Sequence, residues 1–491
     1  MNLIQSLFNS NAYQPPVNAI ELIETHISWI LLTGQFAYKI KKPVQFDFLD
    51  FSTLEKRRFY CEEELRLNCR FSSELYLHVV PITGTLEQPQ INGIGEAIEY
   101  AVQMRQFSAN QLLSEMALTT EIIDQLAAIT ADFHQRADVD ISASSYGSAT
   151  ETHRWFSGNF VHIRPFFDAT QLELWGEQEW LKITPLMAQR KQQGFIRECH
   201  GDLHLGNIAL FENRVTPFDG IEFNSALRWI DVMSDVAFLV MDLEQRNLKP
   251  LAYRFLNRYL SRTGDYSGIS LLRYYLVYRA LVRTKVSLLR WQQHQNSQDF
   301  VDAKNYANLA ESFTTPKPPV LLITHGFSGS GKTTTSTKLA ETFGIIHLRS
   351  DVERQRLFAA AENRDIYSAK HTQQTYQTLA DFAVAILNAG FSVLIDATFL
   401  KLEQRVLFQK LATEQKVKFL ILDFQATKEE LSRRIIQRQQ IGNDASEATL
   451  EVLQQQLKTA QPLTLLEQND VIQANSAADA FEELCKKIAM F

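Results

Sequence analysis

The sequence predicts two domains, an α+β domain followed by an α/β domain with a parallel, doubly wound sheet. A chain of 491 residues is longer than most single domains. Strands and then a long run of helices are expected in residues 1–314, whereas strands and helices alternate in residues 318–491, as βαβ units require. The prolines of residues 314–319 separate the two patterns, because proline cannot continue a helix.

The N-terminal domain is expected to begin with a small antiparallel sheet and one helix. Runs of alternating or apolar residues predict the strands, and a charged run with apolar anchors predicts the longer helix. The expected elements are a short helix at 19–25, strands at 27–32, 36–40, 75–81 and 98–104, and a helix at 54–69. From residue 111 to about 309 the pattern is mostly helical, apart from strand-like pieces at 207–211 and 214–218.

The C-terminal domain is expected to alternate between strands and helices. Its strands are short apolar runs, which is typical of parallel strands buried on both faces. The expected strands lie at 319–325, 345–348, 391–396 and 418–423, and the expected helices at 334–343, 378–388, 428–439 and 446–457.

The composition is that of a folded, soluble chain. Hydrophobic residues make up 45% and charged residues 21%. The formal net charge of -7 provides no global basic field, so nucleic acid is a possible partner but not a favoured one. We expect a cytoplasmic protein without a membrane partner, because no apolar run spans a bilayer and the start of the chain lacks signal-peptide features. The four cysteines show no metal-type or redox-type spacing: Cys61, Cys69, Cys199 and Cys485.

The strongest motif is the glycine-rich segment from Gly326 to Thr333, which lies between an expected strand and an expected helix, as in a phosphate-binding P-loop. Its glycines bring backbone N–H groups to phosphate oxygens, and the helix N-terminus favours the same anion. Lys332 would direct its charge to the β- and γ-phosphates, and the Thr333 hydroxyl would bind Mg²⁺, so we expect ATP and Mg²⁺ here. The expected nucleotide-binding residues are Gly326, Phe327, Ser328, Gly329, Ser330, Gly331, Lys332, Thr333 and Thr334.

Three later features indicate phosphoryl transfer. Asp351 follows the second strand, where it could act as the base for an acceptor hydroxyl, with Arg354 holding an anionic acceptor; a helix-capping role is the alternative. Asp396 ends a buried strand, as a Walker-B carboxylate near Mg²⁺ would. Arg434 and Arg438 share a helix face, so they could close over the phosphates, or their stems could simply cover apolar surface.

A second candidate site lies in the first domain. Asp202, Asn207 and Asp219 follow the order of a phosphoryl-transfer centre, with an asparagine five residues after the first aspartate. Asp202 would accept the proton of an attacking hydroxyl, and Asn207 and Asp219 would hold Mg²⁺. His200 would fix the loop through hydrogen bonds, and a bracing role is favoured for Asp235.

The pattern His-Gly-Asp-x-x-x-x-Asn, followed by a strand and an aspartate, is similar to the aminoglycoside phosphotransferase and choline kinase group over roughly residues 20–310. This resemblance implies a protein-kinase-like α+β fold, with the same roles for the three residues above. It also implies that Lys39 contacts the α- and β-phosphates. Its partner is expected to be Glu64, with Glu63 as the alternative. A clear glycine-rich loop is missing before Lys39, where Thr33-Gly34-Gln35 is a minimal substitute.

Residues 318–490 resemble the small P-loop kinases, such as gluconate kinase, polynucleotide 5′-kinase and zeta-toxin relatives. The motifs described above carry this resemblance, and residues 444–448 look like the segment that follows the lid in that group. The joined order resembles bacterial proteins described as bifunctional aminoglycoside phosphotransferase-like/ATP-binding proteins. The substrates of those proteins are not implied by the resemblance. From both sites together we expect an ATP- and Mg²⁺-dependent kinase with two nucleotide sites that transfers a γ-phosphoryl group to hydroxyl acceptors, expected to be small molecules.

Two alternatives remain open from the sequence. The first domain could bind a ligand without chemistry and regulate the P-loop ATPase, which the weak glycine loop favours. The C-terminal domain could instead phosphorylate nucleic-acid 5′ ends. The net negative charge of the chain makes this alternative less favoured. The motifs identify neither the acceptors nor an oligomeric state.

Overall fold

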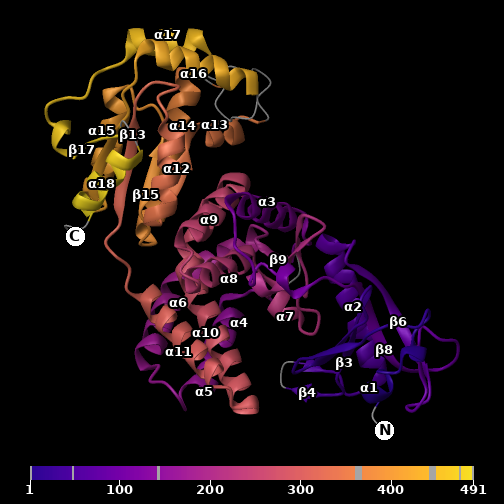
Figure 1. Cartoon of the computed structure of the whole chain (residues 1–491). Helices are drawn as coiled ribbons and strands as arrows, with labels where there is room; N and C mark the ends of the chain where they lie inside the picture. The colour runs from indigo at the N-terminus through magenta and orange to yellow at the C-terminus, as the bar shows by residue number, and fades with distance from the viewer. Residues whose placement is uncertain are drawn as a thin grey trace. The chain divides into compact units, whose positions relative to one another are not determined.

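The computed structural model describes residues 3–46, 49–140, 144–359, 366, 368–441, 449–474 and 477–488. The chain forms two compact units that do not follow chain order (Figure 1). The first unit comprises Met1–Ile122, Asp132–Arg154 and Pro185–Leu239, and the second comprises Ile123–Ala131, Trp155–Thr184 and Val240–Phe491. The domain boundary expected between residues 314 and 318 remains a prediction from the sequence.

The first unit contains an antiparallel sheet in the order β1-β2-β3-β8-β6-β7. Helix α2 (Leu54–Ser72) packs on β6 and β8. The strands are β1 (Glu21–Glu24), β2 (Ser28–Leu32), β3 (Phe36–Lys41), β6 (Tyr76–Gly84), β7 (Pro89–Ile91) and β8 (Ala97–Arg105). Because side chains alternate along a strand, Lys39 and Lys41 share one face of β3.

The helix expected at residues 19–25 is wrong. This segment contains β1, which pairs antiparallel with β2 from Glu21–Leu32 to Glu24–Trp29. Its short run of apolar and acidic residues is compatible with a helix or with a strand. The backbone hydrogen bonds that β2 offers at the edge of the sheet favour the strand.

The predicted strand pieces after the His200 loop are confirmed as an antiparallel hairpin. Strand β10 (Ile208–Phe211) pairs with β11 (Arg214–Pro217). Strand β9 (Ile196–Glu198) leads into the loop and pairs with β12 (Trp229–Asp231). The β9–β12 pair flanks the segment that carries Asp202, Asn207 and Asp219. The β10–β11 hairpin lies between Asn207 and Asp219 and brings these two residues to the same end of the hairpin. The α+β arrangement expected for this part of the chain is confirmed.

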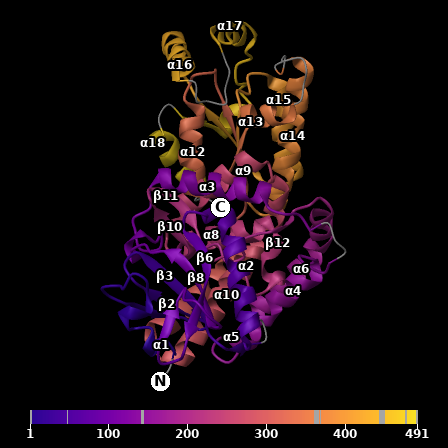
Figure 2. The same ribbon diagram turned by 90° about the vertical axis from the view of Figure 1, so that its right-hand side faces the viewer.

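The second unit contains the predicted parallel sheet, with strand order β14-β15-β13-β16-β17. Figure 2 shows α12 and α18 on one side of it and α14 and α15 on the other, so the sheet is doubly wound, as predicted. The strands are β13 (Val320–His325), β14 (Ile346–Arg349), β15 (Val393–Asp396), β16 (Lys418–Asp423) and β17 (Val471–Gln473), of which β17 was not expected. The core includes Leu322, Leu394, Leu420 and Ile472.

The helices around this sheet position the P-loop and the residues that face it. Their bounds are α12 (Lys332–Phe343), α13 (Ser350–Leu357), α14 (Ala369–Asn388), α15 (Leu402–Glu414), α16 (Lys428–Ile441), α17 (Leu450–Thr459) and α18 (Ala477–Ile488). Helix α14 starts nine residues before the expected helix. Helix α17 starts at Leu450, after the N-cap Thr449, and ends two residues after the expected 446–457 helix.

Helices that precede the proline-rich segment belong to the second unit as well. Helix α9 (Lys249–Thr263) contacts α12, where Arg254 Nη1 lies 2.9 Å from Glu341 Oε1. Asn257 Nδ2 donates to the Ile345 carbonyl at 2.9 Å beside the edge strand β14. The remaining helices are α1 (Leu3–Ser6), α3 (Thr120–Arg136), α4 (Ala149–Gly158), α5 (Phe160–Ile163), α6 (Thr170–Gln192), α7 (Ser225–Arg228), α8 (Val232–Gln245), α10 (Ile269–His294) and α11 (Ser297–Thr314).

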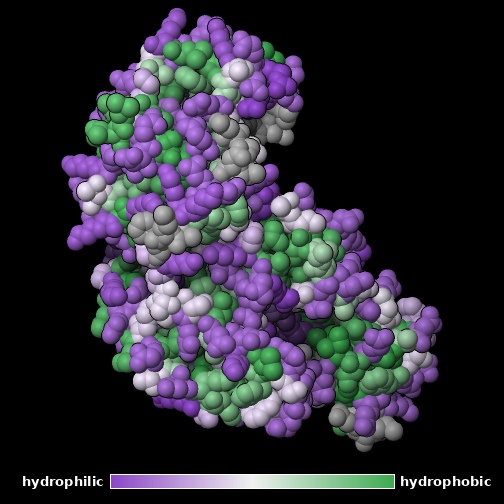
Figure 3. Space-filling view, turned by 60° about the vertical axis from the view of Figure 1, so that its left-hand side comes forward, coloured by the Kyte–Doolittle hydropathy of each residue, from purple (hydrophilic) through white to green (hydrophobic). Residues whose placement is uncertain are grey.

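The face seen in Figure 3 is covered largely by hydrophilic side chains, with hydrophobic side chains in small patches. Within the described part of the chain, none of the helices combines the length and the apolar character needed to cross a bilayer.

Candidate functional sites

Two lysines and three carboxylates form an ion-pair cluster in the first unit. Lys39 Nζ lies 2.8 Å from Glu64 Oε1 and also contacts Asp219. Lys41 Nζ lies 2.8 Å from Glu64 Oε2 and also contacts Glu222. Glu64 therefore bridges two lysines, whereas the sequence indicated only one of them. The signal for Lys41 was its position two residues after Lys39, which places both side chains on one face of the strand.

The helical phase of α2 decides which glutamate reaches Lys39. Cys61, Glu64 and Asn68 are buried at spacings of three and four, so they share the face that packs on the sheet. Glu63 lies beside this face and pairs with Arg66, at 2.7 Å from its Nη2. The partner that the sequence favoured is the one the structure places beside Lys39.

Opposite charges outweigh burial at the centre of this cluster. Burial alone would disfavour the charged forms. The ammonium groups of Lys39 and Lys41 nevertheless lower the pKa of Glu64 to about 2. In turn, the carboxylates of Asp219 and Glu64 raise the pKa of Lys39 well above its ordinary value. At Glu222, burial prevails over the nearby Lys41 and raises the pKa of the carboxyl.

Asp202 and Asn207 lie together in the loop after β9. Asn207 Nδ2 donates to Asp202 Oδ2 at 2.9 Å and to the Asp202 carbonyl at 3.0 Å. Because Nδ2 is used in this way, Oδ1 is the Asn207 atom that can bind a metal. The Asp202 side chain is 35% exposed, so a substrate hydroxyl can reach it. His204 packs within the loop, where its Nδ1 accepts a hydrogen bond from the Gly206 N–H at 3.1 Å.

Hydrogen bonds join the Asp202 loop to the Asp219 segment. His200 Nε2 lies 2.9 Å from the Phe218 carbonyl, and the Ile221 N–H donates to the His200 carbonyl at 2.9 Å. Asp235 accepts hydrogen bonds from the backbone N–H groups of His200 at 2.8 Å and Gly201 at 2.9 Å. Asp235 therefore braces the loop, as its position favoured. Burial lowers the pKa of His200, which keeps the ring neutral in this role.

Asp219 adopts a left-handed backbone conformation, with φ of 61°. Its N–H donates to the Tyr76 hydroxyl at 3.1 Å, and the Gly220 N–H donates to Asn68 Oδ1 at 2.9 Å. These contacts hold the uncommon backbone, which is frequent at functional sites. The Asp219 side chain is 41% exposed, so the carboxylate faces both Lys39 and solvent.

The turn between β1 and β2, at the Lys41 end of β3, contains no glycine. Register pairs Ser28 with Lys41, so the turn between β1 and β2, Thr25-His26-Ile27, adjoins this end of β3. The Thr33-Gly34-Gln35 turn, considered above as a substitute for a glycine loop, closes the hairpin at the other end of β3. Its distance along the strand from Lys41 makes it a poor cover for a phosphate at these lysines.

The P-loop joins β13 to α12 in the second unit. Gly326, Gly329 and Gly331 have φ of 143°, 85° and 94°, which only glycine adopts easily. A Cβ on Gly329 would lie 3.0 Å from the Leu431 carbonyl, so α16 packs directly on the loop. Lys332 Nζ donates to the carbonyls of Gly326 at 3.0 Å and Phe327 at 2.7 Å. Burial lowers the pKa of Lys332 to about 8.

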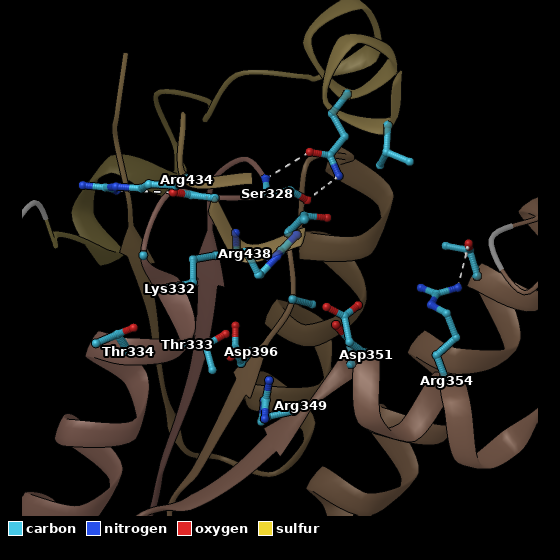
Figure 4. Close-up of a pocket in the computed structure, with 18 of the residues that line it drawn as sticks. Ser328, Lys332, Thr333, Thr334, Arg349, Asp351, Arg354, Asp396, Arg434 and Arg438 are labelled. Atoms are coloured by element: carbon cyan, nitrogen blue, oxygen red, sulfur yellow. Dashed lines mark hydrogen bonds between the residues drawn. The ribbon is translucent and has the colours of Figure 1, made fainter. Parts of the chain in front are cut away.

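A cavity of about 360 Å³ lies at the P-loop (Figure 4). Most of the residues predicted for this site line the cavity. They come from the P-loop and from α12, α13, β15 and α16. They are Ser328, Gly329, Gly331, Lys332, Thr333, Thr334, Asp351, Asp396, Arg434 and Arg438. Gly326, Phe327 and Ser330 belong to the same loop but do not line the cavity directly. Residues 444–448 lie outside the described residues.

Asp396 ends β15 next to Thr333 (Figure 4). Within the described part of the chain, its buried Oδ2 atom has no hydrogen-bond partner of good geometry, and His347 Nε2 is 3.4 Å away. Burial alone would raise its pKa, but His347 and Lys332 lower it. A buried carboxylate oxygen beside a threonine hydroxyl fits Mg²⁺, which prefers oxygen ligands. His347 was missed from the sequence, where it is one polar residue in an apolar strand.

Asp351 and two arginines line the side of the cavity formed by α13. Arg349 pairs in register with Asp396, which brings the start of α13 to the ends of the central strands. Arg354 Nη1 donates to the Ile366 carbonyl at 2.9 Å and to Thr372 Oγ1 at 3.2 Å. Arg349 is the N-cap position of α13, and Asp351 lies in its first turn, where an acidic side chain also favours the helix N-terminus.

The arginine pair of α16 lines the cavity while the same helix makes an apolar contact. Leu431 and Ile435 are buried with Leu453 of α17 in a cluster against Phe327 of the P-loop. Arg434 Nη1 donates to the Gly329 carbonyl at 3.3 Å. The apolar residues thus fix the helix on the loop, and the arginines face the space where phosphates would lie.

The family described as AAA domain matches residues 321–463. The chain is 30% identical to the uncharacterized protein Rv2004c of Mycobacterium tuberculosis over 446 residues, which are 87% of this chain and 88% of that protein. The uncharacterized protein Mb2027c of Mycobacterium bovis shows the same identity and coverage.

Two solved structures show weaker likeness. A choline/ethanolamine kinase family protein from Mesorhizobium loti is 9% identical, with a TM-score of 0.39, over 66% of this chain and 92% of that one. A gluconokinase from Sinorhizobium meliloti is 18% identical, with a TM-score of 0.27, over 35% of this chain and 94% of that one. Neither likeness, at such a TM-score, indicates a function for this chain.

Proposed function

The chain belongs to the family of the Mycobacterium tuberculosis protein Rv2004c, and we propose that it is an ATP- and Mg²⁺-dependent phosphotransferase with two nucleotide sites. The observation that carries the proposal is the cavity at the P-loop, where Lys332, Thr333, Asp351 and Asp396 meet. The acceptors would be small molecules with a hydroxyl group. We propose no more specific acceptor for either site.

In the C-terminal site, glycines and backbone N–H groups of the P-loop would hold the phosphates. Lys332 and the Arg434–Arg438 pair would balance their negative charge. Thr333 and Asp396 would hold Mg²⁺, which supplies charge stabilisation for the transferred group when bound. Asp351 would orient the acceptor hydroxyl and accept its proton.

In the N-terminal site, Lys39 would hold the nucleotide phosphates and Glu64 would hold Lys39 in place. Asp219 and Asn207 Oδ1 would bind Mg²⁺, which requires the Asp219 carboxylate to leave Lys39. Asp202, fixed by its bond from Asn207, would accept the proton of the acceptor hydroxyl.

The test is acceptor-stimulated ADP release by the full chain with sugars, nucleosides and choline-like alcohols. Asp202→Asn is expected to lower the turnover of the N-terminal site on the order of 100- to 10,000-fold and to leave the turnover of the C-terminal site unchanged. Lys332→Ala should do the converse. Lys42→Ala, directly after β3, and Lys338→Ala on α12 are matched controls, because both lysines lie close in the chain to the site lysines but outside the proposed sites. If Asp202→Asn and Lys332→Ala both keep full turnover with every acceptor, the proposal is wrong.

A second candidate function keeps chemistry at the P-loop only. The glycine-free turn beside Lys41 and the direct Lys39–Asp219 contact favour a first unit that binds a ligand without transfer. In that case Asp202→Asn changes no turnover, whereas Lys39→Met changes the rate at the P-loop.

A further inference from the structure

Gln456 of α17 reaches the P-loop with both ends of its side-chain amide. The Ser328 N–H donates to Gln456 Oε1 at 3.0 Å, and Gln456 Nε2 donates to Ser328 Oγ at 3.0 Å. Figure 4 shows these two bonds at the labelled Ser328, on the rim of the cavity. The Ser328 N–H fixes the orientation of the amide, because exchanging its oxygen and nitrogen would place two donors against each other at that N–H.

The rest of α17 holds this amide in place. The helix begins after Thr449, whose Oγ1 accepts a hydrogen bond from the Val452 N–H at 3.4 Å. Leu453 packs in the apolar cluster with Leu431 of α16. Val452 and Gln456 are one turn apart, and both line the cavity. The helix thus presents Gln456 to the same space as Lys332 and the arginine pair.

An amide nitrogen carries two N–H donors. One donor of Gln456 Nε2 is used by Ser328 Oγ, and the second has no partner among the residues that the structure describes. Ser328 lies near the start of the loop, before the backbone N–H groups at the start of α12 that would hold the α- and β-phosphates, whereas Lys332 would reach the β- and γ-phosphates. A group bound beside Ser328 would therefore be the outer end of a phosphate chain.

We propose that Gln456 recognises the terminal phosphate of ATP in the C-terminal site. Ser328 holds the amide, and the second N–H of Nε2 donates to an oxygen of the γ-phosphate. This inference rests on the proposed nucleotide site at the P-loop. It makes Gln456 a determinant of the preference for a triphosphate over a diphosphate, which lacks the outer group.

The experiment compares binding of a non-hydrolysable ATP analogue and of ADP by titration calorimetry, in full-length protein with Mg²⁺. Only the binding that Lys332→Ala removes is scored, so that the first unit does not contribute. Gln456→Ala should weaken binding of the ATP analogue on the order of 10-fold, as for loss of a hydrogen bond to a charged group, and change ADP binding less than about 2-fold. Gln456→Glu should weaken the analogue more, because a carboxylate repels phosphate and offers no donor.

The controls are Gln454→Ala and Gln455→Ala, which remove exposed glutamines of the same helix and should leave both affinities unchanged. An unchanged affinity for the ATP analogue in Gln456→Ala overturns the inference. An equal loss of affinity for the analogue and for ADP also overturns it, because that result assigns Gln456 a purely structural role. If the protein with native Gln456 shows no binding that depends on Lys332, the proposed P-loop site is itself wrong and the inference is rejected with it.

Discussion

Removing Lys41 should destabilise the first unit far more than its place beside Lys39, the lysine proposed to bind phosphate, would indicate. Lys41 is fully buried, and it neutralises Glu64 and Glu222, whose side chains are 0% and 3% exposed. Lys41→Met keeps a side chain of similar length but leaves these carboxylates with Lys39 as their nearest cation. Breaking a buried ion pair on one side costs about 3–5 kcal/mol, because the partner charge stays buried without compensation.

Hydrogen exchange measured by mass spectrometry gives the free energy of opening for each segment of the chain. It therefore does not require that the unfolding of a chain of two units be fitted as one transition. Peptides from β3 and α2 of Lys41→Met should exchange on the order of 100- to several thousand-fold faster, since each 1.4 kcal/mol is a factor of ten. Peptides from the sheet of the second unit should exchange as in the unaltered protein.

Two variants separate the buried charge from other effects. Lys41→Met combined with Glu222→Gln removes one charge of each sign, so the net charge of the cluster is unchanged and most of the protection should return. Lys42→Ala removes the neighbouring lysine, which pairs with the exposed Glu24, and should cost at most about 1 kcal/mol. Protection of β3 within about 1 kcal/mol of the unaltered protein in Lys41→Met would refute this reasoning.

Further predictions concern the P-loop, the Asp202 loop and the cysteines. Gly329→Ala should weaken nucleotide binding at the P-loop at least 10-fold, because its φ of 85° and the Leu431 carbonyl 3.0 Å from the new Cβ both oppose a side chain; Gly158→Ala, in open space on α4, is the control in the same titration. Asp235→Asn should lower the Asp202-dependent turnover on the order of 10-fold or more while Lys332-dependent turnover stays constant, since one of its two backbone donors loses an acceptor; equal loss of both activities would point to unfolding. Iodoacetamide at pH 8 should label Cys69 and Cys485 before Cys61 and Cys199 in a mass-spectrometric time course, because burial raises the pKa of Cys61 to about 12 and also raises that of Cys199; early labelling of Cys199 would contradict its buried place in the fold.

Sites made from neighbouring residues could be predicted from the sequence. The P-loop between β13 and α12 is such a case, because one run of eight residues contains the glycines, the lysine and the threonine that its chemistry needs. The Asp202 loop is another, since Asp202, Asn207 and Asp219 lie within 18 positions of one another along the chain.

Residues far apart in the sequence were harder to join. Glu64 could be favoured over Glu63, but the packing face of α2 makes the choice. Lys41 could be placed on the face of Lys39 by alternation, yet nothing in the sequence joined it to Glu222. Residues 19–25 were expected to be helical even though their partner strand is close in the chain, because a short run of apolar and acidic residues fits a helix or an edge strand equally well.

By itself the sequence determined the two fold classes and the P-loop, and it pointed to many of the polar residues proposed for the two sites, because local periodicity and short-range spacing carry that information. Only the tertiary structure decided which polar groups meet: Lys41 with Glu222, His347 with Asp396, and Gln456 with Ser328. The physical reason is that sheet order and helix packing set the distance between residues that are tens to almost two hundred positions apart, and no pattern within one segment contains that distance.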